Sequence, residues 1–144
     1  MRVAAIDLGD ARTGVALSDI LGKQAGEAIV IEEWNKERLC KKMAELFAEK
    51  GVTKVAVGHP VNMDGTKGKK AEEAKAFAEM LAAETSLPVT LWDERRTTVE
   101  AHQILLFAGK NAKKRKKTVD AVAATLILEG YLAFLAKEKG GEKL

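Results

Sequence analysis

The stretch MRVAAIDLGDARTGVALSD, residues 1–19, decides the fold. Its apolar run VAAI leads directly into Asp7, although Asp is depleted from β-strands. The alternation of side chains along a strand would turn this acid toward the core. An ionised carboxylate that is buried without a partner is strongly unfavourable, unless it is hydrogen-bonded, paired or bound to a metal. Asp7 is therefore expected at an open strand end or beside a bound cation.

Outward from this stretch, the pattern predicts three strands followed by alternating helices and strands. Residues 3–8 and VALSD (15–19) form a hairpin, and AIVI (28–31) completes an antiparallel meander. The next expected elements are a helix from Leu39 to Gly51, a strand TKVAVG (53–58), a helix across 74–81 and a strand LPVTLW (87–92). A Thr97–Glu100 capping box opens an expected helix from Thr97 to Phe107. Thr118 caps the expected last helix, whose inward stripe is Val119, Val122, Ala123, Leu126 and Leu132. This order predicts an α/β fold: a mixed five-stranded sheet, with a three-strand antiparallel meander, two parallel strands and helices on both faces.

Composition is that of one folded domain. The 144 residues are 47% hydrophobic and 31% charged, which suits a folded chain rather than a disordered one. We expect a single domain over residues 1–137 and a frayed tail over 138–144. No apolar run approaches the length of a membrane helix. The lone Cys40 fits a packed thiol in a reducing cytoplasm.

Positive charge is concentrated in one short segment. Residues 110–117 hold six Lys or Arg and no acid, whereas the other 18 basic residues are outnumbered by 21 acidic ones. Such a local patch favours a polyanionic partner. The alternative is a solvated loop between two helices.

Four acids fall where the predicted topology brings chain segments together. Ligands of such sheets bind outside the carboxyl ends of the parallel strands, and these ends are at Asp7, at Gly58–His59 and at Asp93–Glu94. Asp120 interrupts an apolar pattern in the first turn of the last helix. We therefore expect Asp7, Asp120 and one or both of Asp93 and Glu94 to form one cluster.

Clustered carboxylates repel one another unless cations neutralise them. Oxygen ligands without Cys or paired His suit Mg²⁺ or Mn²⁺, and two such ions can promote phosphodiester hydrolysis. Each acid also has a structural explanation. Asp120 could complement the helix dipole, and Asp93 could pair with Arg95 or Arg96.

Together, IDLGDARTGVALSD (6–19), VGHPVNMDGTKG (57–68), DERRTT (93–98) and KKRKKTVDAVAATLIL (113–128) resemble the YqgF family of pre-16S rRNA nucleases, also described as Holliday-junction-resolvase-like proteins. The resemblance covers roughly residues 3–135. It implies a ribonuclease H-like fold and a nuclease using Mg²⁺ or Mn²⁺, active in 5′-end processing of pre-16S rRNA. By position, it assigns the catalytic and metal-binding roles to Asp7, Glu94 with Asp93 beside it, and Asp120.

The expected partner is nucleic acid, either structured RNA or branched DNA, bound mainly through phosphates. The candidate contacts are Arg12, His59, Asn62, Lys113, Lys114, Arg115, Lys116 and Lys117. The bland interpretation, an ordinary loop residue, is the favoured one for His59, and for Asn62 the two interpretations are about even. The aromatic residues are scattered, so a row of stacking side chains is not expected.

Two other functions compete with the nuclease. Strand-Asp-x-Gly-turn-strand also occurs in the phosphate hairpin of actin-like and sugar-kinase ATPases, but those proteins close two domains around the nucleotide. A non-catalytic nucleic-acid-binding or transcription-associated protein would use the basic segment and leave the acids structural. The oligomeric state, monomer or homodimer, stays open.

Overall fold

The computed structural model describes residues 1–60, 68–94 and 112–142, with only the backbone described at 112–120 and 139–142. The strands are β1 (Arg2–Asp7), β2 (Arg12–Ser18), β3 (Ala25–Glu32), β4 (Val52–His59) and β5 (Val89–Asp93). They form one sheet in the order β3-β2-β1-β4-β5. The helices are α1 (Lys36–Lys50), α2 (Lys69–Thr85) and α4 (Ala112–Glu142). The mixed five-stranded sheet is confirmed.

The first three strands form the antiparallel meander, and the last two are parallel to β1. Ile6 pairs with Val15 of β2 on one side and with Val57 of β4 on the other. The β1–β2 connection is tight at Gly9, where a side-chain Cβ would lie 2.0 Å from the carbonyl oxygen of Arg12. Glycine is required there because the backbone approaches so closely.

Helix α1 begins and ends at residues whose chemistry fits those places. Asn35 caps its first turn by accepting a hydrogen bond of 2.9 Å from the backbone N–H of Arg38. Gly51 ends it in the left-handed conformation at φ 68°, which costs glycine nothing. Cys40 is 2% exposed on the inward face, so the packed thiol is confirmed.

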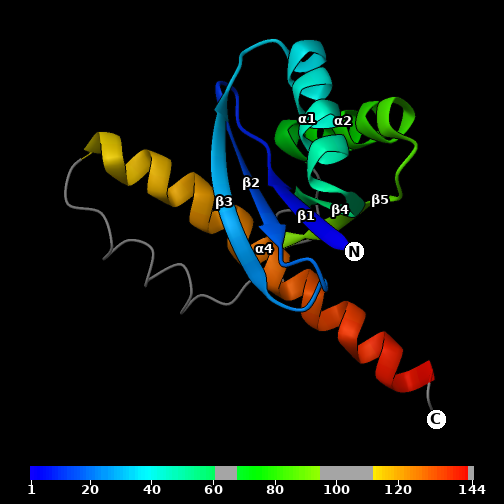
Figure 1. Ribbon diagram of the computed structural model, residues 1–144. Helices are drawn as coiled ribbons and strands as arrows, with labels where there is room; N and C mark the ends of the chain where they lie inside the picture. The colour runs from blue at the N-terminus through cyan, green and yellow to red at the C-terminus, as the bar shows by residue number, and fades with distance from the viewer. Residues whose placement is uncertain (61–67, 95–111, 143–144) are drawn as a thin grey trace.

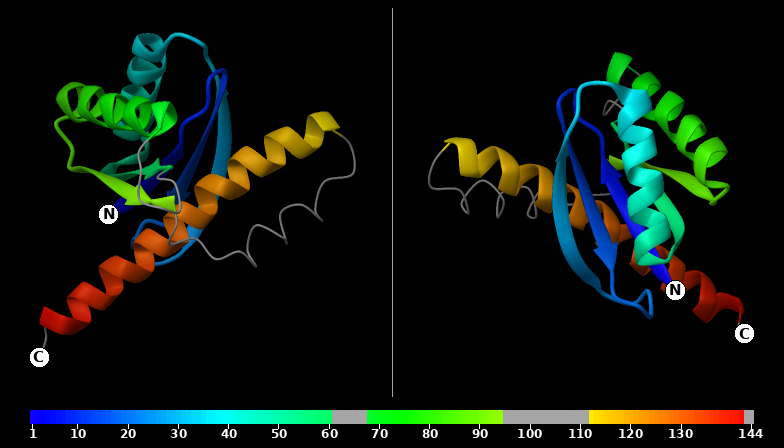
Figure 2. Two further views of the ribbon diagram at one scale, coloured as in Figure 1. Left: turned by 180° about the vertical axis from the view of Figure 1, so that it is seen from behind. Right: turned by 45° about the horizontal axis from the view of Figure 1, so that its top comes forward.

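Helices cover both faces of the sheet, as predicted. Figure 1 shows α1 and α2 on one side of the sheet and α4 on the other. In the left view of Figure 2, α4 crosses the sheet diagonally. One core therefore lies under α1 and α2, around Ile6, Phe47 and Phe77. The other lies under α4, around Trp92 and Leu128.

Helix α4 begins earlier than the sequence pattern indicates. Its backbone is helical from Ala112, so the basic residues 113–117 belong to a helix rather than to a loop, and Thr118 is not its first residue. Lys and Arg are good helix formers, which explains why the helix continues through them. The helix extends to Glu142, past the expected domain boundary at residue 137, and fraying of 138–144 stays a prediction.

The inward stripe of α4 also differs from the expected one. The buried residues on it are Ala124, Ile127, Leu128, Tyr131 and Leu132. Val122, Ala123 and Leu126 are only partly buried. The segment AVAATLIL is apolar on most of its circumference, so periodicity alone does not fix which side faces the sheet.

The expected helix at Thr97–Phe107, with its Thr97–Glu100 capping box, lies outside the described residues. None of the described helices is long and apolar enough to span a membrane.

Candidate functional site

Three parallel strands end side by side at one edge of the sheet. β1 pairs with β4 up to Ile6 and Val57, and β4 pairs with β5 up to His59 and Asp93. Asp7 follows Ile6 directly. The carboxyl ends therefore meet at one rim, as the sequence predicted for Asp7, for His59 and for the Asp93–Glu94 pair.

Asp7 and Glu94 lie on the same face of this rim. Val3 and Ala5 belong to the core under α4, so alternation along β1 places Asp7 on that face too. Between β1 and β5 lies Gly58, whose missing side chain leaves space for the Glu94 carboxylate. A Cβ on Gly58 would lie 2.9 Å from Glu94 Oε1.

Gly58 also sets how closely α4 approaches the rim. The same added Cβ would lie 2.7 Å from Cδ1 of Ile127. Ile127 is 2% exposed and packs in the core under α4. A glycine in the middle strand thus lets a helix and a carboxylate share one narrow space on this face.

Asp93 belongs to the other face. Val89 and Leu91 pack against the core under α1 and α2, and Asp93 continues their alternation along β5. Its register partner on β4 is His59. The two adjacent acids, which the sequence could not separate, are therefore turned toward opposite faces of the sheet.

Asp120 is described by its backbone alone. It lies in α4, one helical turn before Ala124, which is fully buried against the sheet. Positions 120, 124 and 127 share one stripe of a helix. Among the side chains that the structure describes, no group of three or more His, Cys, Asp or Glu could hold a metal ion. The Asp120 carboxylate is outside that set.

The residues expected to contact nucleic acid fall in different environments. Arg12 opens β2, half-exposed, with its Nε 3.8 Å from Glu32 Oε1. His59 is 8% exposed, and its Nε2 has no hydrogen-bond partner among the described residues. A buried imidazole does not favour the surface contact with phosphate that the sequence suggested. Asn62 lies outside the described residues.

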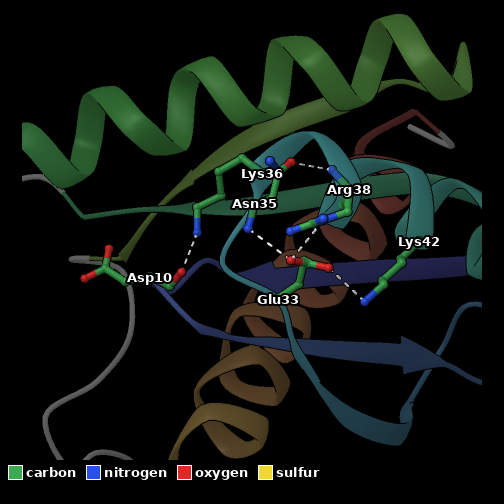
Figure 3. A network of polar contacts seen from close by, with 6 residues as sticks. All are labelled: Asp10, Glu33, Asn35, Lys36, Arg38 and Lys42. Carbon is green, nitrogen blue, oxygen red and sulfur yellow. Dashed lines mark hydrogen bonds and ion pairs between the residues drawn. The ribbon is translucent and has the colours of Figure 1, made fainter.

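One lysine at the rim, Lys36, has no signal in the sequence pattern. Lys36 Nζ donates hydrogen bonds to the carbonyl oxygens of Gly9, at 2.7 Å, and of Asp10, at 2.9 Å. These bonds tie the start of α1 to the turn that follows Asp7, and Figure 3 shows the one to Asp10. No local pattern connects residues 26 and 27 positions apart, so only the folded chain reveals the contact.

A neighbouring acid, Glu33, anchors the same junction. Its carboxylate accepts a hydrogen bond of 3.1 Å from the backbone N–H of Asn35 and one of 3.0 Å from Lys42 Nζ, and it lies 3.4 Å from Arg38 Nε (Figure 3). The Asn35 N–H, then the two cations, hold the pKa of Glu33 down at about 2. The loop between β3 and α1 is thus fixed on the α1 side of the rim.

Two relatives of this chain carry the name of an rRNA nuclease. A protein of Geobacillus named "Putative pre-16S rRNA nuclease" is 46% identical over 134 residues, covering 92% of this chain and 97% of its own length. A protein of Listeria monocytogenes with the same name is also 46% identical over 134 residues, with the same two coverages.

Solved structures are similar in fold. RuvC of Thermus thermophilus, solved with a Holliday junction substrate, superposes with a TM-score of 0.62 at 18% identity, over 93% of this chain and 96% of its own. The fowlpox virus resolvase, solved with Holliday junction DNA, gives a TM-score of 0.57 at 11% identity, over 94% of this chain and 99% of its own. These likenesses confirm the ribonuclease H-like fold. The family described as "RuvX: Holliday junction resolvase" matches residues 1–134, and the chain belongs to this family.

Proposed function

We propose that the protein is a metal-dependent nuclease that hydrolyses phosphodiester bonds at the rim of β1, β4 and β5. The observation that carries this proposal is the placement of Asp7 and Glu94 on one face, with Gly58 leaving the space between them. Two carboxylates on one face of the rim repel each other, and a bound cation would relieve that repulsion.

The donor set fits a hard divalent cation. Asp7 and Glu94 offer carboxylate oxygens, and the same face carries no Cys or His at the ends of these strands. Oxygen ligands of this kind favour Mg²⁺ or Mn²⁺ over zinc. We infer that Asp120, on the stripe of α4 that packs against the sheet, supplies the third carboxylate. Asp93 is left out of the metal site because it lies on the other face.

Bound Mg²⁺ or Mn²⁺ would supply an activated water and charge stabilisation for the leaving oxygen. The residues of the chain do the rest. Asp7 and Glu94 would hold the cation that neutralises the reacting phosphate. The hydrogen bonds of Lys36 fix the turn that follows Asp7. The basic helical segment 113–117 binds flanking phosphates with little dependence on sequence.

For the substrate, we propose precursor 16S rRNA, processed at its 5′ end in the cytoplasm. Support comes from relatives of 46% identity that carry the pre-16S rRNA nuclease name. Branched DNA is the second candidate, because the family that matches residues 1–134 is described as Holliday junction resolvases. A binding protein without catalysis is the third, and metal-dependent cleavage separates it from the other two.

The first prediction concerns Asp7→Asn. Purified protein with Mn²⁺ or Mg²⁺ is expected to cleave a pre-16S rRNA fragment, and the variant is expected to lose at least about a hundredfold in rate, because electrostatic stabilisation at the reacting phosphate is lost. RNA binding measured without divalent metal should stay unchanged. The matched control is Glu45→Gln, an exposed acid on α1 far from the rim.

Equal cleavage by the wild-type protein and Asp7→Asn would show that the activity is a contaminant and would overturn the nuclease proposal. A four-way DNA junction measured in parallel decides the substrate, since faster cleavage of the junction than of the rRNA fragment would favour the second candidate.

A further inference from the structure

A groove of about 540 Å³ runs between α2 and the junction of β3 with α1. It is lined by Trp34 and Lys36 of the junction, Asp10 of the β1–β2 turn, and Lys69, Phe77 and Met80 of α2. This face of the sheet is the one opposite to Asp7 and Glu94. The groove is therefore distinct from the proposed hydrolytic site, although the two meet at the same rim.

The groove presents apolar side chains to solvent. Trp34 is 75% exposed and Met80 is 37% exposed, while Phe77 forms the buried floor at 2% exposure. A large aromatic side chain left in water on the rim of a groove is typical of a binding surface. Tryptophan in particular offers a broad face for stacking at little cost in side-chain freedom.

Charge at the groove is balanced. Lys36 is held on the carbonyl oxygens of Gly9 and Asp10, and Lys69 Nζ lies 3.9 Å from Glu73 Oε1. Two lysines are thus offset by the acids Asp10 and Glu73. This balance does not favour a bare phosphate. It is compatible with a flat, uncharged group that lies against the apolar side chains.

One end of the groove lies near the carboxyl rim of the sheet. Helix α2 follows β4, so Lys69 lies near the carboxyl rim, and Met80 lies about 16 Å farther along the helix. Asp10 is three residues from Asp7, at most about 11 Å along the chain. The groove therefore begins next to the proposed site, where Trp34 lies two residues before Lys36, and Met80 is its lining residue farthest along α2.

We propose that this groove binds an unpaired base of the strand that flanks the scissile bond, stacked on Trp34 and sided by Met80. The proposal rests on the nuclease function above and adds a substrate feature to it: a single-stranded flank next to the cleaved position. Bases stack on aromatic side chains without sequence preference, and single-stranded RNA exposes its bases for such contacts. Lys36 and Lys69 would lie near the backbone that leads to the rim.

The test uses two RNA hairpins, one blunt and one with a three-nucleotide overhang that carries 2-aminopurine, titrated into the full-length protein without divalent metal. We expect quenching of 2-aminopurine on binding. Trp34→Ala should weaken binding of the overhang hairpin by on the order of tenfold and leave the blunt hairpin unchanged, and Trp34→Phe should restore most of the loss. Leu21→Ala is the matched control, because Leu21 is 66% exposed on the β2–β3 turn.

Several results would overturn the proposal. Equal affinities of the wild-type protein and Trp34→Ala for the overhang hairpin would exclude base stacking at the groove. A lower sedimentation mass of Trp34→Ala, with unchanged RNA affinity, would assign the groove to contact between copies of the chain. Discrimination between the hairpins can fail while Asp7-dependent cleavage persists, in which case the groove inference falls and the nuclease proposal stands. Failure of the wild-type protein to bind either hairpin would overturn both.

Discussion

Gly58 is the residue at which packing and the proposed chemistry meet. A Cβ on residue 58 would lie 2.7 Å from Ile127 Cδ1 and 2.9 Å from Glu94 Oε1. Any side chain there therefore competes with these two atoms for space. Since Ile127 can change rotamer and Glu94 can swing away, the protein should still fold. The carboxylate, however, would no longer lie over the middle strand at Gly58.

We therefore predict that Gly58→Ala reduces metal-dependent cleavage by about 10- to 100-fold, because misplacing a reacting group by about 1 Å has effects of this size. The free energy of unfolding should fall by only about 1–3 kcal/mol, as expected for overpacking. Gly68→Ala is the control, since an added Cβ there meets nothing within 4 Å. Undiminished turnover of Gly58→Ala would show that Glu94 need not lie over Gly58.

The lowered pKa of Glu33 predicts how the stability of the fold changes at acid pH. Its pKa falls from the ordinary 4.5 to about 2 in the folded protein, through the Asn35 N–H first and then Lys42 and Arg38. A carboxyl whose pKa is lower in the folded than in the unfolded chain stabilises the fold above pH 4.5. That contribution is lost as the pH falls from about 4.5 to about 2.

Urea unfolding of the wild-type protein and Glu33→Gln measures this contribution. The difference in the free energy of unfolding should be constant from pH 7 to pH 5 and should shrink between pH 4.5 and pH 2. Glu49→Gln, an exposed acid near the end of α1, should show no such pH dependence. A difference for Glu33→Gln that stays constant down to pH 2 would contradict the contacts of Figure 3.

Among the elements, α4 differs most from its sequence-based prediction, and the difference sharpens a test. Residues 113–116 are helical, and Ala is the best helix former. Changing Lys113, Lys114, Arg115 and Lys116 to Ala should therefore keep the helix. We predict weaker RNA binding for all sequences alike and a smaller dependence of log K on log salt, because fewer counterions are released.

Circular dichroism checks that the helix content is unchanged, and titrations at several salt concentrations give the slope. The control replaces Lys41 and Lys75, which are exposed on α1 and α2, with Ala. An unchanged salt slope in the four-residue variant would mean that the basic segment does not touch the phosphates.

At the scale of the whole molecule, one sheet separates two cores. Leu81 of α2 is fully buried in the core between the sheet and α1 and α2, and Leu128 of α4 is fully buried in the core between the sheet and α4. Because the same five strands form one side of each core, the layers should unfold together. Truncating either leucine to Ala should lower the free energy of unfolding by about 2–5 kcal/mol.

The measurement follows urea unfolding by far-UV circular dichroism and by the fluorescence of Trp92, in a Trp34→Phe background. Trp92 is 6% exposed in the core under α4, so it reports on that layer alone. Both probes should give one midpoint in each variant. If Leu81→Ala shifted the circular dichroism transition and left the Trp92 transition in place, the two layers would be independent.

The sequence by itself determined the elements that have a strong local signal. The sequence pattern located the five strands, and Gly51 marked the end of α1 through capping chemistry that needs only neighbouring residues. The start of α1 at its Asn35 cap was not predicted. The rim at Asp7, His59 and Asp93 followed from strand order. The phase of α4 did not follow, because a helix that is apolar on most sides has no preferred inward stripe until a sheet packs against it.

Only the tertiary structure decided what lies together at the rim. The turn of Asp93 and Glu94 to opposite faces depends on the pairing of β5 with β4, and the space for Glu94 depends on Gly58 of another strand. Lys36 is hydrogen-bonded to the turn after Asp7, which is distant from it in the chain. The groove beside Trp34 is likewise lined by segments that are distant in the chain. Contacts of this kind arise from packing between elements, so the local conformational preferences of the residues do not predict them.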